Sequence, residues 1–347
     1  MFDFSSFLSN KAFITEDHHV YTYADLLGLS ERFSEHLVPR SLIFIGCENS
    51  LESIVAYVSC LRSGVVPLLL SRDVPDETLY HLEAIYHPRY CWFPSRRDLL
   101  VKGKEKYSLG GYSLIQYDGD SPVLPEGLAL LLTTSGSTGS PKLVRLSHDN
   151  LKSNACSIIE YLKITSSEKA ITSLPMYYSY GLSVLNSHLL AGATLLLTDK
   201  SYVQREFWKF VLEEKATSFA GVPFTYEILK KMRFEKFLPS SVKVMTQAGG
   251  KLNSSLIKYF SEYARLHDIR FYVMYGQTEA TARMSYLPAE YTLNKVGSVG
   301  VAIPGGHFSL IDEDGMRIVS PNVEGELVYE GSNVFWGYAE SLDDLFK

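Results

Sequence analysis

Short apolar runs and helical periods alternate along most of the chain. Leu42 to Cys47 is an apolar run of strand length, and Val65 to Leu70 is another. Between them, the apolar side chains that precede Gly64 recur every three or four residues, at Leu51, Ile54, Val55, Val58 and Leu61. A strand, a helix and a second strand in this order form a βαβ unit, so the two strands are expected to pair in parallel with the helix packed on the sheet.

The same cycle returns further along. A strand is predicted at Leu128 to Thr133, followed by a helix whose inward positions are Leu151, Ala155, Ile158, Ile159 and Leu162. Further strands are predicted at Ala193 to Thr198, Ser218 to Val222, Val242 to Thr246 and Arg270 to Tyr275, with helices between them. The pattern predicts an α/β fold of layered parallel sheets with packed helices, organised as two α/β subdomains.

The pattern changes near residue 285, where Gly and Pro become frequent and apolar positions alternate with period two. His307 to Ile311 and Met316 to Val319 read as strands, and Asp312 to Gly315 reads as the turn that joins them. We therefore expect an α/β body over residues 1–284 and a β-rich subdomain, a small antiparallel barrel or sheet, over residues 285–347.

Composition and charge indicate which kinds of binding partner and which cellular compartment to expect for this protein. The 347 residues are 46% hydrophobic and 21% charged, with a net charge of −6, and no basic stripe predicts a nucleic-acid or acidic-membrane partner. No signal peptide or membrane-spanning apolar stretch is apparent. The four cysteines are far apart and three lie in apolar runs, which indicates buried free thiols: Cys47, Cys60, Cys91 and Cys156. A cytoplasmic protein is expected.

Residues 134–142 form a loop of small hydroxyl residues and glycines closed by a lysine. Hydroxyl donors come from Thr134, Ser135, Ser137 and Thr138, close backbone approach from Gly136 and Gly139, and a positive charge from Lys142. This composition is typical of a loop that wraps a polyphosphate. It is not a Walker A loop, because Pro141 precedes the lysine and Leu143 follows it.

A second motif, Tyr275-Gly276-Gln277-Thr278-Glu279, follows the predicted strand Arg270 to Met274. Ligands bind at the carboxyl ends of parallel strands, so this is an expected place for a crevice. The tyrosine offers a flat face for a purine, Thr278 a hydroxyl for a phosphate oxygen, and Glu279 a carboxylate for Mg²⁺.

These motifs, in this order, resemble those of the adenylate-forming superfamily, which contains acyl-CoA synthetases, carrier-protein adenylation domains and luciferases. The loop and the following residues 147–151 resemble the family's phosphate loop, and residues 275–279 match its YGxTE motif. Similar segments span the chain at residues 61–68, 175–181, 247–252, 297–305 and 325–338. Two positions depart from the family pattern: Leu143 stands where glycine is usual, and Tyr178 stands where many members have histidine.

The resemblance implies that ATP and Mg²⁺ convert a carboxylic acid to an acyl-adenylate, whose acyl group then passes to a thiol of coenzyme A or of an acyl carrier protein. Thr278, Glu279 and Lys142 would be catalytic, with Glu279 as the metal ligand. The other implied residues are Thr134 to Gly139, Gly249, Gly250, Tyr275 and Gly276 for the nucleotide, and Tyr178, Gly181, Val222 and Ala248 for the acid.

Residues 175–190 contain no Asp or Glu to pair with a substrate ammonium, so an apolar or aromatic acid is favoured over an α-amino acid. The family's later Thr-Gly-Asp motif and its C-terminal lysine have no counterpart after residue 338. We therefore expect the large N-terminal domain of a longer enzyme, with poor turnover. A serine hydrolase and a P-loop kinase do not fit the motifs, whereas a non-catalytic module that binds a nucleotide or an acyl-adenylate remains an alternative.

Overall fold

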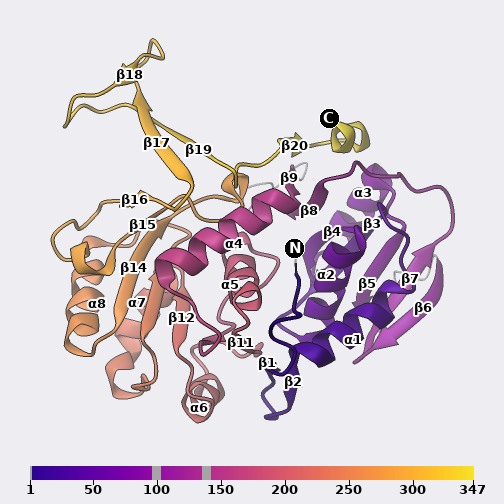
Figure 1. Ribbon diagram of the computed structural model, residues 1–347, viewed down its shortest axis with the longest axis horizontal. Coiled ribbons are helices and arrows are strands. Elements are labelled where there is room, and N and C mark those ends of the chain that lie inside the picture. The colour runs from indigo at the N-terminus through magenta and orange to yellow at the C-terminus, as the bar shows by residue number, and fades with distance from the viewer. Residues whose placement is uncertain (1, 96–102, 135–141) are drawn as a thin grey trace.

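The computed structural model describes residues 2–95, 103–134 and 142–347. Within these residues the strands form two large sheets, of nine and eight strands, and one small sheet of three. Figure 1 shows the two large sheets side by side, with α4 and α5 near the middle of the molecule. The predicted α/β fold class is confirmed.

The eight-stranded sheet has a parallel centre, β8-β4-β3-β5, and antiparallel strands at both edges. In sheet order its strands are β20 (Tyr338–Ala339), β9 (Leu143–Ser147), β8 (Leu128–Thr133), β4 (Val66–Ser71), β3 (Leu42–Cys47), β5 (Tyr90–Pro94), β7 (Tyr112–Tyr117) and β6 (Gly103–Leu109). The expected parallel pairing of the first βαβ unit is confirmed, because β3 and β4 pair in parallel.

The nine-stranded sheet contains the later strands and the N-terminal hairpin. In sheet order it consists of β16 (Val301–Ala302), β15 (Ser285–Leu287), β14 (Arg270–Tyr275), β13 (Val244–Gln247), β12 (Ser218–Gly221), β10 (Lys169–Ile171), β11 (Thr194–Leu196), β1 (Lys11–Ile14) and β2 (Val20–Thr22). The run from β14 to β1 is parallel. Its strands therefore end together at one edge of the sheet, where a ligand crevice is expected.

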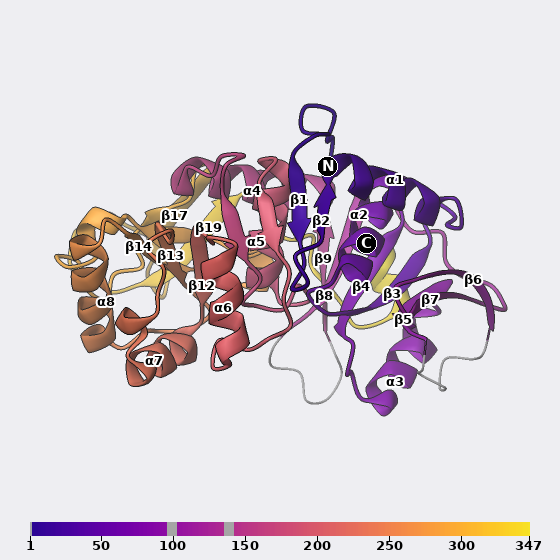
Figure 2. The same cartoon turned by 90° about the horizontal axis from the view of Figure 1, so that it is seen from below.

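The helices cover both faces of the large sheets. They are α1 (Tyr23–Ser34), α2 (Leu51–Ser63), α3 (Asp76–Tyr86), α4 (His148–Leu162), α5 (Ser179–Leu190), α6 (Arg205–Glu213), α7 (Pro223–Met232) and α8 (Ser254–Leu266). Alternation along β13 shows the layering: Met245 packs with α6, α7 and α8, whereas Val244 packs with α4 and α5. Figure 2 shows α6 to α8 and α4 on opposite sides of these strands.

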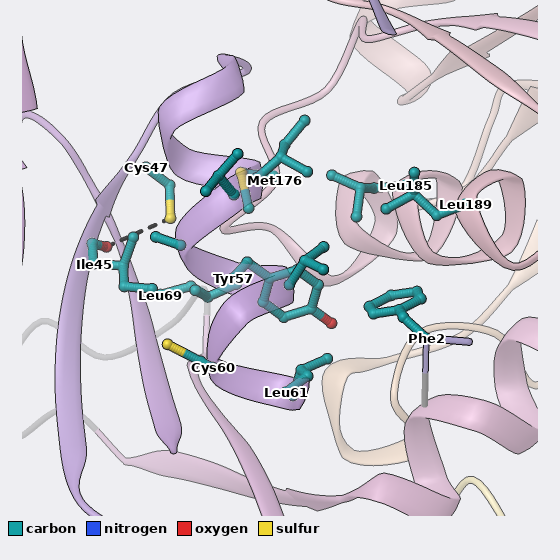
Figure 3. Packing of buried hydrophobic residues seen from close by; sticks show 14 of the residues in the cluster. Phe2, Ile45, Cys47, Tyr57, Cys60, Leu61, Leu69, Met176, Leu185 and Leu189 are labelled. Atoms are coloured by element: carbon teal, nitrogen blue, oxygen red, sulfur yellow. Dashed lines mark hydrogen bonds between the residues drawn. The ribbon is translucent and has the colours of Figure 1, made fainter. Parts of the chain in front are cut away.

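One apolar core joins the two sheets through α2 and α5. Tyr57 and Cys60 of α2 belong to the same buried cluster as Met176, Leu185 and Leu189, as Figure 3 shows. The Tyr57 hydroxyl also donates a 3.0 Å hydrogen bond to Oδ1 of Asn186. The two α/β halves are therefore packed against each other through buried apolar surface.

The small sheet consists of β17 (Gly306–Ile311), β18 (Arg317–Ile318) and β19 (Glu326–Gly331), all antiparallel. The predicted turn is present, since the Gly315 amide donates to the Asp312 carbonyl. Because β15 and β16 continue the nine-stranded sheet, the boundary expected near residue 285 falls inside that sheet.

The sequence predicted free, buried cysteines and no membrane-spanning stretch. The four cysteines are free, and Cys47, Cys60 and Cys91 are buried as expected, whereas Cys156 on α4 is exposed and the expectation of burial was wrong for it. Among residues 2–95, 103–134 and 142–347, no helix has both the length and the apolar character needed to cross a bilayer.

Candidate active site

The predicted phosphate loop connects β8 to β9, which pair as an antiparallel hairpin with Thr133 opposite Leu143. The structure describes the two ends of this loop, Thr134 and Lys142. The predicted residues Ser135 to Gly139 lie outside the described residues. Leu143 is fully buried and pairs with Ala339 on its other side. Its departure from the family's glycine is therefore explained by packing in the exit strand.

Lys142 and Glu279 lie on two sides of the Tyr338 side chain. The Tyr338 hydroxyl donates a 2.7 Å hydrogen bond to Oε1 of Glu279. The ammonium of Lys142 lies 5.0 Å from the centre of the Tyr338 ring and 3.0 Å from Oε1 of Glu340. The structure therefore brings together the cation and the carboxylate that the sequence placed in two separate motifs.

Strand pairing places Tyr338 at this point. β20 pairs with β9, so that Tyr338 lies opposite Val144, two residues after Lys142. The hydrogen bond to Glu279 and partial burial raise the pKa of the Tyr338 hydroxyl to about 12. The hydroxyl is therefore a stable donor to the Glu279 carboxylate at neutral pH.

Thr278 and Glu279 lie in a short 3₁₀ turn, Thr278–Ala280, directly after β14. The Thr278 hydroxyl lies 3.2 Å from the Ser179 hydroxyl at the start of α5. Gly276 is needed here, because a Cβ at this position would overlap the backbone of Ala282. The chain thus turns back on itself after the strand and leaves two hydroxyls and one carboxylate at its end.

Asn333 holds this turn from behind. Its side-chain amide donates to the carbonyls of Ala280 and Arg283, at 2.8 and 3.0 Å. The backbone carbonyl of Asn333 accepts a 2.7 Å hydrogen bond from the Thr281 hydroxyl. Because Asn333 is 3% exposed, these bonds are shielded from water and fix the backbone that carries Glu279.

Residues 147–151, which the sequence grouped with the phosphate loop, have a structural role. Ser147 and Asn150 form a capping box at the start of α4. The Asn150 amide also donates to the carbonyls of Ser332 and Val334, at 2.7 and 2.9 Å. The motif therefore starts α4 and anchors the segment that leads to Tyr338.

A cavity of about 520 Å³ opens beside this turn. Its lining includes four predicted nucleotide residues: Gly249, Gly250, Tyr275 and Gly276. Gly249 has φ +82°, and a Cβ there would overlap the Tyr178 hydroxyl and lie 3.1 Å from Cγ1 of Val222. Tyr178 and Val222, which are two of the predicted acid-pocket residues, thus form the wall behind Gly249. Residues of the lining not identified from the sequence include Ile257, Val273 and Val299.

The predicted acid pocket begins at this wall. Tyr178, Val222 and Ala248 belong to one apolar cluster on the face of the nine-stranded sheet that α4 and α5 cover. Gly181 lies in the first turn of α5 against the Pro175 backbone, where a Cβ would not fit. The cluster offers an apolar, partly aromatic surface next to Thr278 and Ser179.

The sequence did not single out Ser179, Asn333 or the hydroxyl of Tyr338 as parts of the site. Each acts through a contact with a residue about 50 or more positions away, and no local motif marks such contacts. For the metal, no group of three His, Cys, Asp or Glu side chains gathers within the described parts of the chain. A metal ion here would have Glu279 as protein ligand and would need other oxygens, as Mg²⁺ bound with substrate phosphates has.

Comparison with known proteins shows similarity to coenzyme A ligases. The 2-succinylbenzoate–CoA ligase of Bacillus cereus is 31% identical over 357 residues, which cover 97% of this chain and 71% of that protein. The feruloyl-CoA synthase of an Amycolatopsis species is 29% identical over 238 residues, 66% of this chain and 47% of that protein.

The fold agrees as well. The o-succinylbenzoate CoA synthetase of Bacillus subtilis, solved in complex with its acyl-adenylate intermediate, superposes with a TM-score of 0.77 at 22% identity, covering 95% of this chain and 68% of that one. The same enzyme with ATP and a magnesium ion gives a TM-score of 0.74 at 23% identity, with 95% and 69% covered. Residues 6–339 match the family described as AMP-binding enzyme. This chain therefore belongs to the AMP-binding enzyme family, a family of acid–thiol ligases, as its motifs indicated.

Proposed function

We propose that this chain binds Mg·ATP and a carboxylic acid at the candidate active site and forms an acyl-adenylate, which then acylates the thiol of coenzyme A. The observation that carries the proposal is the position of Lys142 and Glu279 on two sides of Tyr338, at the end of β14 and beside the 520 Å³ cavity. A cation and a carboxylate that share one tyrosine contact, with the carboxylate three residues after the cavity-lining Gly276, fit a polyphosphate substrate.

Each residue has a role that follows from its position. The nucleoside occupies the cavity between Gly249 and Tyr275, and the triphosphate extends toward Lys142. Thr278 and Ser179 would direct two hydroxyls to the α-phosphate, and Glu279, whose Oε1 accepts the Tyr338 hydrogen bond, would be the protein ligand of Mg²⁺. When bound, Mg²⁺ supplies positive charge against the phosphate oxygens.

The chemistry requires mainly positioning. An oxygen of the acid attacks the α-phosphorus, a new carbon–oxygen–phosphorus link forms, and the bond to the β-phosphate breaks to release pyrophosphate. Lys142 binds the departing phosphates and lowers the cost of their charge. The thiol then attacks the acyl carbon, and AMP leaves. Because the acid is already a nucleophile, its orientation by the pocket is the main contribution of the protein.

We further propose that the acid is aromatic or apolar at the reacting end. Tyr178, Val222 and Ala248 form an apolar surface there. The two relatives described above are named for 2-succinylbenzoate and for the feruloyl group, and each name refers to an aromatic acid. Coenzyme A is favoured as acceptor because both relatives are named as coenzyme A enzymes. The alternative acceptor is the thiol of an acyl carrier protein. We place the reaction in the reducing cytoplasm.

Equilibrium binding tests the proposal without depending on turnover. Non-hydrolysable aryl- and alkyl-sulfamoyl adenosines, which imitate acyl-adenylates, are titrated calorimetrically, and ATP–pyrophosphate exchange is measured with the matching acids. Binding of aryl mimics together with acid-dependent exchange supports the proposal. Binding of the mimics without exchange, also in a chain extended to the length of its relatives, supports a non-catalytic adenylate-binding module instead. A folded protein that binds neither ATP nor any mimic contradicts both.

A further inference from the structure

A buried arginine lies on the inner side of the proposed acid pocket, with no acidic partner among the residues that the structure describes. Arg283 is 1% exposed. Its guanidinium lies 4.6 Å from the centre of the Tyr180 ring and donates to the hydroxyls of Ser183 and Tyr161, at 3.2 and 2.8 Å. It forms no ion pair with any acidic side chain in the described residues. One of its nitrogens, Nη2, has no hydrogen-bond partner there.

This arrangement is costly in the ligand-free protein. A guanidinium stays charged at any physiological pH, so burial cannot be relieved by loss of its proton. Hydroxyls and an aromatic face stabilise the charge only in part, and a buried charge without a counterion destabilises the fold. An anion that reached Nη2 would satisfy the charge and the missing hydrogen bond together.

The Arg283 side chain, which carries Nη2, lines a small internal cavity. The cavity holds about 20 Å³, room for one water-sized group, and is bounded by Val184 and Ser187 of α5 and by Ala220 and Thr246 of the sheet. Glu168 also lines it, but its carboxylate accepts a hydrogen bond from Thr217 and forms no ion pair with Arg283. The cavity is thus large enough for one oxygen of an anionic group beside the Arg283 side chain.

The cavity lies directly inward from the proposed acid pocket. Ala220 and Thr246 pair across neighbouring strands, and two residues further along the same face are Val222 and Ala248 of the pocket. Two residues of a strand span about 7 Å. Contacts along α5 give a similar distance between the two places. The Ser179 hydroxyl lies 3.2 Å from the Thr278 hydroxyl, and the Ser183 hydroxyl, one helical turn later, accepts a hydrogen bond from Arg283.

We infer that Arg283 binds a second anionic group on the acid substrate, about one helical turn away from the carboxylate that is activated. The substrate class is then a dicarboxylic acid, or an acid with another anionic group, whose two charges are separated by a short apolar spacer between Tyr178 and Tyr180. This inference rests on the proposed function, because the reacting carboxylate is placed by Thr278 and Ser179.

The test compares two sulfamoyl adenosines that differ in one group: 4-carboxybenzoyl and 4-carbamoylbenzoyl, the second being a neutral twin of the first. We expect the wild-type protein to bind the carboxylate roughly tenfold or more tightly than the amide, as for a buried charged hydrogen bond. Arg283→Met should bring the two affinities within about twofold while AMP affinity stays the same, and Arg283→Lys should retain part of the preference.

Arg270→Met is the matched control. Arg270 begins β14 and donates to the Leu162 carbonyl, and its own side chain does not line the small cavity. This variant removes one arginine charge at the start of β14 and should keep the wild-type preference. Equal affinity of the wild-type protein for the two twins overturns the inference, and so does an equal loss for both twins in Arg283→Met. Failure of the wild-type protein to bind either twin, or AMP, overturns the proposed function itself.

Discussion

The hydroxyl of Tyr338 donates a 2.7 Å hydrogen bond to the carboxylate of Glu279, across 59 positions of sequence. The bond joins the last strand of the eight-stranded sheet to the turn at the end of β14 in the nine-stranded sheet. The carboxylate that we propose as metal ligand therefore depends on both halves of the molecule for its orientation. Lys142 contacts the same tyrosine from the phosphate loop.

This bond predicts unequal effects of two substitutions. Glu279→Gln removes the charge that attracts Mg²⁺, and we expect Mg·ATP to bind about tenfold or more weakly, while metal-free AMP binds as before. Tyr338→Phe removes only the orienting hydrogen bond at a part-exposed position, so a loss of about two- to fivefold is expected. Calorimetric titration with and without Mg²⁺ measures both. An unchanged Mg²⁺ dependence in Glu279→Gln would exclude this carboxylate as the metal ligand.

Lys142 should discriminate between nucleotides by their phosphates. Lys142→Gln is expected to weaken ATP binding about tenfold and to leave AMP binding within about twofold, because the lysine extends from the phosphate loop. Glu340→Gln is the control. It removes the acidic partner of Lys142 at an exposed pair, which contributes little to stability, and should leave ATP affinity equal or higher. A parallel loss for ATP and AMP in Lys142→Gln would argue against a phosphate contact.

Gly249 offers a test of the wall between nucleotide and acid. Gly249→Ala introduces a Cβ against the Tyr178 hydroxyl, and weaker binding of an aryl-sulfamoyl adenosine is expected. Gly297→Ala is matched, because that glycine also has a positive φ and lines the same cavity, but a Cβ there meets no atom within 4 Å.

The double variant Gly249→Ala/Tyr178→Phe removes the overlapping oxygen. It should recover most of the affinity lost in Gly249→Ala, whereas Gly297→Ala should show only the smaller effect of backbone strain, about 1 kcal/mol of unfolding free energy. Affinity for the mimic and the free energy of unfolding are both measured. If the double variant binds no better than Gly249→Ala, steric contact with Tyr178 is not the cause.

His188 predicts part of the pH dependence of stability. Burial lowers its pKa to about 4, and the charge of Arg283 acts in the same direction, while its Nδ1 donates to the Val184 carbonyl. Since the unfolded pKa is about 6.5, the unfolded state binds more protons between pH 6.5 and pH 4. This contribution to stability is therefore complete above pH 6.5 and is lost as the pH falls toward 4, by about 3 kcal/mol at most.

Urea unfolding of His188→Asn, which keeps a donor but does not titrate, measures this contribution. Its unfolding free energy should fall less than that of the wild-type protein between pH 6.5 and pH 4. Equal slopes for the two proteins would show that His188 is already protonated or exposed in the folded state.

Local sequence was sufficient where neighbouring residues determine the structure. The strands Leu42–Cys47, Leu128–Thr133 and Arg270–Tyr275 have the predicted bounds, because at least five of the six residues in each form an apolar or glycine-containing run. The end of α2 at Gly64 follows from its left-handed conformation, φ +69°.

Long-range contacts were beyond such patterns. Tyr338 and Asn333 belong to the segment 325–338, which the sequence identified only by its resemblance to the family, and the position of Tyr338 depends on how β20 pairs with β9. Arg283 follows the YGxTE motif closely in sequence, yet its side chain lies among α4, α5 and β14, and only the packed structure reveals its missing counterion.

The most direct test of the central claim is the identity of the products. The protein is incubated with Mg·ATP, an aryl carboxylic acid and coenzyme A, and the nucleotides are quantified by chromatography. We predict AMP and pyrophosphate in equal amounts, formed only when the acid is present and much reduced in Glu279→Gln. Formation of ADP, or of AMP without any acid, would contradict the assignment of this site to acyl-adenylate chemistry.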